Sequence, residues 1–330
     1  MFPARCIPLI PLIIIGGTGC APAVRLETPA PVTASRWSIP DDNSAPAPAP
    51  LAELLRAPEL EALTKLALSN NSNIRIASAR VAQSQALLRA ARQSTLPDVA
   101  LSAGAYQSIG ATADRSFDFK NAFARLDVNL DLDVFGRLKA GKRAAYSRAY
   151  GAELERAAVT LAIEADVAAA YVQRTALARR VAILETNIER AVELDRVIRV
   201  RTAEGEATRV DQGLQAIQLL NLRDEASRLR QALDQTRTAL AVLTGAEAPG
   251  FAVAPDNVDT MAIPQLSPPP PLNLLAARPD VRASEALIAA ANGDVDQARA
   301  AFFPQVGVSI QGLLEGVTGS PFGKSVNVGS

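Results

Sequence analysis

The sequence predicts a mainly α-helical protein with a smaller β portion and a tandem structural repeat. Three observations lead to this fold class: a strand with one apolar face, a very long uninterrupted helix directly after it, and an internal repeat at an offset of 207 residues. Long antiparallel coiled-coil helices and β-hairpin strands are therefore the expected elements.

Composition excludes several classes of function. The 330 residues carry a formal net charge of zero, so a basic nucleic-acid-binding surface is not expected. The chain has no histidine, which removes the commonest general base and metal ligand. No phosphate loop, nucleophile elbow or metal-ligand cluster is present, and no apolar run is long enough for a spanning helix. We expect no enzyme activity, no cofactor and no metal.

The N-terminus reads as a secretory signal that ends in a lipidation site. Arg5 supplies a positive region, residues 7–15 are apolar, and small residues precede Cys20. This order resembles a bacterial lipobox, in which the cysteine is diacylated. The sequence thus predicts a signal peptide over residues 1–19 and a lipidated Cys20 followed by a Pro- and Ala-rich tether over residues 20–50.

Two alternatives to lipidation remain open. The position three before the cysteine is Gly17, where leucine is usual in a lipobox. The chain could instead form a Cys6–Cys20 disulfide, or carry a plain signal peptide that is cleaved elsewhere.

The first copy of the repeat is expected over residues 51–248. Helical segments lead to Pro97, and strands follow at about 98–106 and 119–134. The polar, Gly-containing residues 107–118 are expected to form the loop of this hairpin. A lone hairpin is marginal in water, and in lipid its open edges require a closed barrel.

The second strand has two chemically different faces. Its even positions from 122 to 134 are all apolar. Its odd positions include a run of polar residues: Arg125, Asp127, Asn129, Asp131 and Asp133. Such alternation indicates a strand with one apolar face and one face exposed to water. A solvated strand on a soluble sandwich is the alternative interpretation.

A long helix and a shorter return helix follow this strand. The helix predicted over about 137–202 would be ~100 Å long at ~1.5 Å per residue. Its distal half carries an a/d seam: Leu177, Val181, Leu184, Ile188, Ala191, Asp195 and Ile198. Gly205 ends it, Thr208 and Asp211 form a capping box, and a return helix runs over about 209–244.

The repeat places a second helix-then-strand unit near the C-terminus. At an offset of 207 residues, Arg299 falls on Arg92 and Pro304 on Pro97 without a gap. A Pro-rich linker is expected over 249–271, and an incomplete second copy over 272–330. We expect strands to pair only within the first copy. Because this leaves open strand edges, we expect that the chain alone, a fragment or relic, does not form a complete, working barrel.

Three motifs give the chain a family resemblance: LDLDVFGR at 130–137, RPDVRASE at 278–285 and ARAAFFP at 298–304. Together with the Gly205-to-Asp211 turn, they resemble the TolC-like outer-membrane efflux family. The likeness is to its lipoprotein subclass, which pairs with resistance-nodulation-division pumps, and it covers the chain from Cys20 onward.

The resemblance implies a mainly α-helical fold with a β-barrel portion. It implies a homotrimer that shares one outer-membrane barrel and builds a long periplasmic α-barrel. The partners would be a periplasmic adaptor protein, an inner-membrane pump and outer-membrane lipid. The location would be the outer membrane of a Gram-negative bacterium, with a lipid anchor and with the helices in the periplasm.

The resemblance also assigns site residues. The odd strand positions Arg125, Asp127, Asn129, Asp131 and Asp133 would line the lumen, where the acids would form a ring that favours cations. Phe135 and Gly136 would form the strand-to-helix junction. The adaptor-facing turn would comprise Glu204, Gly205, Glu206, Arg209 and Asp211. Glu204 and Glu206 stand where apolar residues are usual, so they indicate a polar contact or merely a solvated loop.

The expected function is that of a passive exit duct for drugs or other small molecules, within a tripartite efflux system. The alternatives are a periplasmic coiled-coil adaptor or scaffold lipoprotein, and a non-functional truncated relic. An adaptor would explain the helices and the anchor. It would not explain a strand with an apolar outer face that is joined directly to a long helix.

Overall fold

The computed structural model describes residues 51–112, 115–253, 258–263 and 271–318, all within one compact unit. The elements in chain order are α1 (Leu51–Leu54), α2 (Pro58–Asn70), α3 (Ser72–Gln93), β1 (Asp98–Thr112), β2 (Arg115–Leu132), α4 (Arg137–Ala203), α5 (Arg209–Thr244), the 3₁₀ turn η1 (Val258–Thr260), α6 (Pro271–Ala277), α7 (Pro279–Ala300) and β3 (Val306–Thr318). This is the mainly helical fold with a β portion that the sequence predicts. None of the described helices is long and apolar enough to cross a membrane.

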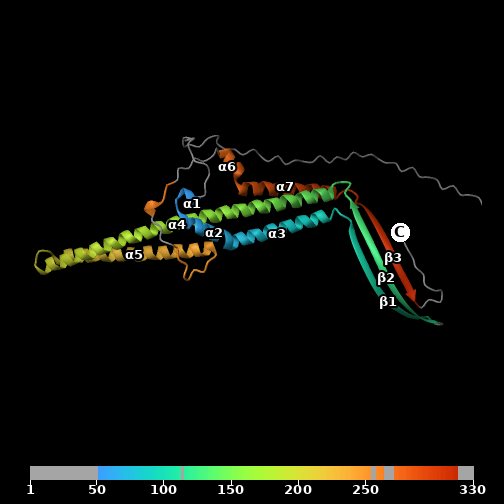
Figure 1. Cartoon of the computed structure of the whole chain (residues 1–330), viewed down its shortest axis with the longest axis horizontal. Coiled ribbons are helices and arrows are strands. Elements are labelled where there is room, and N and C mark those ends of the chain that lie inside the picture. Colours follow the sequence, from blue (N-terminus) through green and yellow to red (C-terminus); the bar gives the residue numbers. More distant parts are fainter. Residues whose placement is uncertain (1–50, 113–114, 254–257, 264–270, 319–330) are drawn as a thin grey trace, which may run out of the picture. The chain divides into compact units, whose positions relative to one another are not determined.

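The helix α4 is the element against which α2, α3, α5 and α7 pack. It has 67 residues, one more than expected, which corresponds to ~100 Å at ~1.5 Å per residue. Helix α5 packs along one half of it, and α3 and α7 pack along the other half (Figure 1). The two halves of α4 therefore have different neighbours.

The distal half of α4 packs on α5 through the seam read from the sequence. Leu177, Val181 and Leu184 are buried there, each less than a tenth exposed. Burial of one such side chain stabilises the fold by about 1.5–3 kcal/mol. The a/d pattern therefore predicted residues that are buried between these two helices.

The reversal between α4 and α5 is built from two caps. The Glu206 N–H donates to the Arg201 carbonyl at 2.8 Å and the Gly205 N–H donates to that of Thr202 at 3.3 Å, which is a Schellman motif. Gly205 has φ +78°, a value that favours glycine. Thr208 and Asp211 then form the predicted capping box at the start of α5.

The C-terminal end of α5 abuts the joint between α2 and α3. The Asn71 side chain accepts hydrogen bonds from the first backbone N–H groups of α3. Its amide nitrogen donates to the Leu243 carbonyl at 2.8 Å. Gly245 has φ +68°, and a Cβ there would lie 2.6 Å from the Asn70 carbonyl oxygen. Helix α3 thus begins where α5 ends and continues along α4.

The principal core lies where α1 and α2 meet the middle of α4 and the end of α5. Its largest fully buried side chains include Leu60, Val167, Tyr171 and Leu240. The segment after α5 also contributes, because Val253 is buried in this core and its carbonyl accepts from Arg174 at 2.8 Å. This core fixes the level on α4 at which α5 gives way to α3.

The helix–strand unit near the C-terminus is the counterpart of α3–β1. Helices α3 and α7 each have 22 residues, and their first residues are 207 positions apart. Helix α7 packs closely on α4 where Gly293 faces Ala144: a Cβ at Gly293 would lie 2.9 Å from the Ala144 Cβ. The two units therefore flank α4 on two sides.

The sheet corrects the expected strand ends. Strands β1 and β2 pair without interruption from Asp98↔Asn129 to Thr112↔Arg115. The expectation of a loop over residues 107–118 is therefore wrong. Each strand satisfies the backbone donors and acceptors of the other, which outweighs the weak strand propensity of Gly and Ser.

The sheet also corrects the expected strand pairing. Strand β3 pairs antiparallel with β2 from Leu132↔Val306 to Lys120↔Thr318, so pairing is not confined to the first copy. The order β1-β2-β3 places β2 in the centre. The reason is physical, since the second edge of β2 would otherwise present unpaired backbone groups.

Several expectations fall on parts of the chain that the structure does not describe. These are the signal peptide 1–19, Cys6 and Cys20, the tether 20–50, and most of the linker after residue 263. They remain predictions.

Candidate functional site

The three strands together present one continuous apolar face. The register aligns Val99, Val128 and Ile310 in one row across the sheet. The other apolar members of this face are Leu101, Ala103, Ala122, Ala124, Leu126, Leu130, Leu132, Val306, Val308 and Leu314. Leu101 is 76% exposed and Ile310 61%. An exposed apolar face that extends across three hydrogen-bonded strands is typical of a surface that faces lipid or a partner.

The opposite face of the sheet carries most of the polar side chains, together with Phe123 and Leu313. Asp98, Asn129 and Ser309 lie in one row, and Asp127 pairs in register with Gln311. Arg125 stands next to Ser102, and all three strands contribute to this face. The structure therefore places the expected lumen-lining residues of β2 on one side, opposite the apolar side chains.

The last two acids of the polar run have partners of their own. Asp131 accepts from the Arg137 guanidinium at 2.5 Å, and both side chains are about one-third exposed or less. The Asp133 carboxylate accepts from the Leu138 and Lys139 backbone N–H groups at 2.9 and 2.8 Å. These contacts satisfy free donors at the start of α4 and place negative charge at its positive end. Sequence reasoning missed this role, although acids just before a helix are a usable signal.

The strand-to-helix junction contains Phe135 and Gly136, as expected. Gly136 has φ +78° and precedes the first residue of α4. The Phe135 ring stacks on Phe303, with centroids 4.8 Å apart and planes inclined by 13°. Phe303 follows α7, so this contact joins the β2–α4 junction to the end of α7. Sequence reasoning did not single out Phe303, although it lies within one of the family motifs.

The expected adaptor-facing turn lies at the end of the α4–α5 hairpin (Figure 1). Glu204, Gly205, Glu206, Arg209 and Asp211 are all exposed there. Hydrogen bonds from the Thr208 hydroxyl and N–H lower the pKa of Asp211. The turn therefore presents glutamates on a backbone that is held rigidly by caps on both sides.

One carboxylate lies inside the seam near this turn. Asp195 is 6% exposed and pairs with Arg199 at 2.7 Å through Oδ2. Its Oδ1 is buried and has no hydrogen-bond partner. A buried carboxylate oxygen without a donor costs free energy, so this position of the seam is not optimised for stability.

Within the described part of the chain, no group of three or more His, Cys, Asp or Glu side chains is arranged to hold a metal ion.

The family model for outer membrane efflux proteins matches residues 63–246, which is more than half of the chain. The chain belongs to the outer membrane efflux protein family. The resemblance inferred from the sequence is therefore confirmed.

Relatives in this family are a quarter to a third identical to the chain over the aligned residues. It is 32% identical over 264 residues to the pyoverdine export outer membrane protein OpmQ of Pseudomonas aeruginosa, covering 77% of this chain and 55% of OpmQ. It is 29% identical over 283 residues to the toluene efflux pump outer membrane protein TtgF of Pseudomonas putida, covering 80% of this chain and 58% of TtgF. The chain therefore spans little more than half the length of these two efflux proteins.

Solved structures of the same kind share the fold. The outer-membrane channel OprN superposes with a TM-score of 0.77 at 25% identity, over 93% of this chain and 72% of OprN. The outer membrane protein VceC of Vibrio cholerae superposes with a TM-score of 0.70 at 22% identity, over 82% of this chain and 67% of VceC. The sheet joined to long helices is thus the fold of outer-membrane efflux channels.

Proposed function

We propose that this efflux-family protein is the outer-membrane channel component of a tripartite efflux system and acts as a passive duct for small molecules, without catalysis. The apolar face shared by β1, β2 and β3 carries this proposal. An exposed apolar face on one side and a polar face on the other is what a barrel wall between lipid and water requires.

The sheet by itself would not close a duct. Strands β1 and β3 are its edges among the described residues, and in lipid an open edge leaves backbone groups without partners. Further strands must therefore pair with these edges. We propose that three copies share one barrel, with α3, α4 and α7 forming part of a periplasmic wall below it.

The partners follow from the position of the α4–α5 turn, at the end of α4 far from the sheet. A periplasmic adaptor would contact this turn, and an inner-membrane pump would supply the energy. Glu204 and Glu206 give the contact a polar, salt-sensitive character. Lipidation of Cys20 would anchor the chain in the outer membrane of a Gram-negative bacterium.

The α4–α5 seam also suits a second function, a periplasmic coiled-coil adaptor or scaffold. An adaptor in water would leave Leu101, Ile310 and their neighbours exposed without a use. The duct accounts for both the seam and the sheet, so it is preferred.

Conductance and extraction together test the duct. The full-length protein is reconstituted in planar bilayers, and a Cys20→Ser variant is extracted from membranes with alkaline carbonate. Stepwise conductance, together with a Cys20→Ser variant that needs detergent for extraction, supports the duct. No conductance, together with release of this variant by carbonate alone, would overturn the duct in favour of an adaptor.

A further inference from the structure

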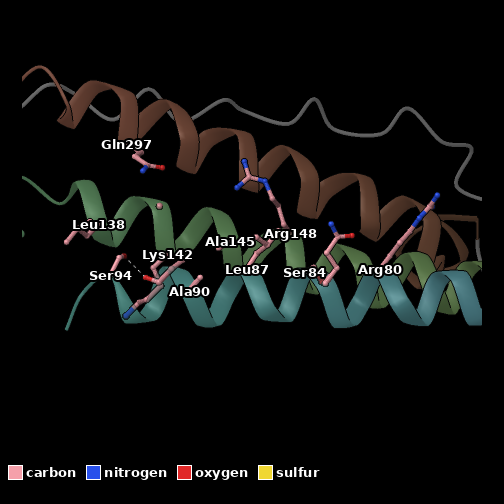
Figure 2. Close-up of a pocket in the computed structure, with 13 residues that line it drawn as sticks. Arg80, Ser84, Leu87, Ala90, Ser94, Leu138, Lys142, Ala145, Arg148 and Gln297 are labelled. Carbon is pink, nitrogen blue, oxygen red and sulfur yellow. Dashed lines mark hydrogen bonds between the residues drawn. The ribbon is translucent and has the colours of Figure 1, made fainter. Parts of the chain in front are cut away.

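A groove of about 610 Å³ runs between α3 and α4 and reaches α7. Figure 2 shows its labelled residues on the three helices, with Arg80 and Ser84 on α3, Lys142 and Arg148 on α4, and Gln297 on α7. The groove lies in the helical layer next to the strand-to-helix junction. Its volume is that of a small-molecule site.

The groove adjoins a hollow at the polar face of the sheet. Ser94 lines it, and Ser94 also lines a smaller hollow together with Asp98, Asn129 and Asp131. Those three residues lie on the polar face. In the duct proposed above, the polar face of the sheet meets the transported solute, so the groove lies next to the path of that solute.

The chemistry of the groove is basic and apolar. None of its thirteen lining residues is acidic, and three are cationic: Arg80, Lys142 and Arg148. Arg80 is paired with Glu155 at 3.4 Å, and Arg148 is paired with Asp294. Lys142 takes part in none of the ion pairs found among the described residues. Its ammonium group is therefore available to a ligand.

Apolar side chains lie beside these cations. Leu87, Ala90, Leu138 and Ala145 contribute to the lining, and Leu87 is 60% exposed. An apolar body that covers Leu87 would gain free energy from the area removed from water. An anionic group on the same molecule would meet Lys142.

We propose that this groove binds amphipathic anions: a carboxylate, sulfonate or phosphate group on an apolar body of one or two rings. The occupant is a solute in the duct, a role that rests on the proposed function; the binding itself does not depend on transport. An anion site here runs against the cation preference expected from the acids of β2. Asp131 and Asp133 are already engaged by other groups, and no acidic side chain lines the groove.

Equilibrium dialysis tests the binding with three matched probes. Naphthalene-2-sulfonate, naphthalene-2-sulfonamide and a naphthyl-methylammonium salt present the same ring with a negative, neutral or positive group. Each is dialysed against the full-length protein in a non-ionic detergent, with detergent alone as the blank. We expect the sulfonate to bind best and the ammonium salt worst.

Lys142→Gln is the decisive variant. It should weaken sulfonate binding about threefold to fivefold, the scale of a partly exposed ion pair, and leave the sulfonamide unchanged. Lys142→Arg should retain binding. Lys139→Gln is the matched control, because Lys139 is an exposed lysine on the same helix outside the groove lining. Equal binding of all three probes, or an equal loss of sulfonate affinity in Lys142→Gln and Lys139→Gln, would overturn the proposal that the groove binds anions.

A lipid headgroup presents the same chemistry, so a competition arm separates the two sources. Dihexanoyl phosphatidylglycerol, below its micelle concentration, is added to the dialysis. Unchanged sulfonate binding supports a solute, whereas full displacement would overturn the assignment in favour of lipid. The two proposals can fail separately. Absence of conductance with intact sulfonate binding would overturn the proposed duct alone. Conductance without sulfonate binding would overturn the proposed anion site alone.

Discussion

Phe135 and Phe303 stack face to face, with ring centroids 4.8 Å apart and planes inclined by 13°. Phe135 follows the central strand and Phe303 follows α7, so one contact connects the β2–α4 junction to a segment that is far away in the sequence. This stack, the β2–β3 ladder and the close packing of α7 on α4 hold the second helix–strand unit in place.

Replacing Phe303 should therefore loosen that unit. An aromatic pair contributes about 0.5–1.5 kcal/mol beyond the area that it buries, so Phe303→Leu should destabilise by about 1 kcal/mol. Phe302 is the matched control, because it is the next residue and is 90% exposed. Thermal unfolding followed by helical circular dichroism measures both. Equal midpoints for the two variants would show that the stack contributes nothing.

Gly293 should not tolerate a methyl group. A Cβ there would lie 2.9 Å from the Ala144 Cβ and 3.0 Å from its backbone nitrogen, so Gly293→Ala should push α7 away at a cost of about 1–3 kcal/mol. Gly213→Ala in α5 is the matched control, because no atom lies within 4 Å of a Cβ there. It should stabilise by about 0.5–1 kcal/mol through helix propensity. Urea unfolding of the two variants should give changes of opposite sign; changes of the same sign would contradict the packing.

Asp195 should be less stabilising than an apolar residue at its position. Its buried Oδ1 lacks a donor, so Asp195→Leu should stabilise the α4–α5 hairpin by about 1–3 kcal/mol. Asp224→Leu serves as the control, because Asp224 is an exposed acid that also pairs four residues on, with Arg228. Hydrogen exchange of amides in the distal half of α4 measures the change. Faster exchange in Asp195→Leu would mean that the ion pair with Arg199 stabilises the hairpin by more than the unsatisfied Oδ1 destabilises it.

Stability of the hairpin turn should depend on acidic pH through Asp211. Its pKa lies below the ordinary value of about 3.9 because the Thr208 hydroxyl and N–H donate to the carboxylate. A lowered folded-state pKa gives a contribution that is full above the unfolded pKa and is lost as pH falls through the folded value. The difference in unfolding midpoint between wild type and Asp211→Asn should be constant above about pH 5 and shrink below about pH 4.

The control for this pH dependence is Glu206→Gln, which removes an acid from the same turn outside the capping box. A difference between wild type and Asp211→Asn that grows as the pH falls would contradict the sign of the effect.

Most of the fold could be predicted from local sequence patterns. The alternation over β2, the seam from Leu177 to Ile198, and the caps at Gly205 and Thr208 depend on neighbours a few residues apart. The repeat offset predicted the second helix-then-strand unit, because it compares the chain with itself. Each of these features can be read without knowing which distant segments touch.

The contacts that were missed join distant segments. Pairing of β3 with β2 depends on where α7 places the following strand, and the Phe135–Phe303 stack depends on both. The groove needs α3, α4 and α7 together, so neither Lys142 nor Arg148 stands out in the sequence. The ion pair of Asp131 with Arg137 and the hydrogen bonds of Asp133 to the start of α4 were missed because the strand alternation already assigned both acids to the lumen.

The most direct test asks which face of β2 meets lipid. Tryptophan is placed at Leu126 or at Asp127 in a Trp37→Phe background, and the protein is reconstituted with brominated phospholipid. The apolar-face account predicts that Leu126→Trp is quenched by the lipid bromines and Asp127→Trp by aqueous iodide. Equal quenching of the two positions by the lipid, or the reverse pattern, would contradict a barrel wall whose apolar face lies against the membrane.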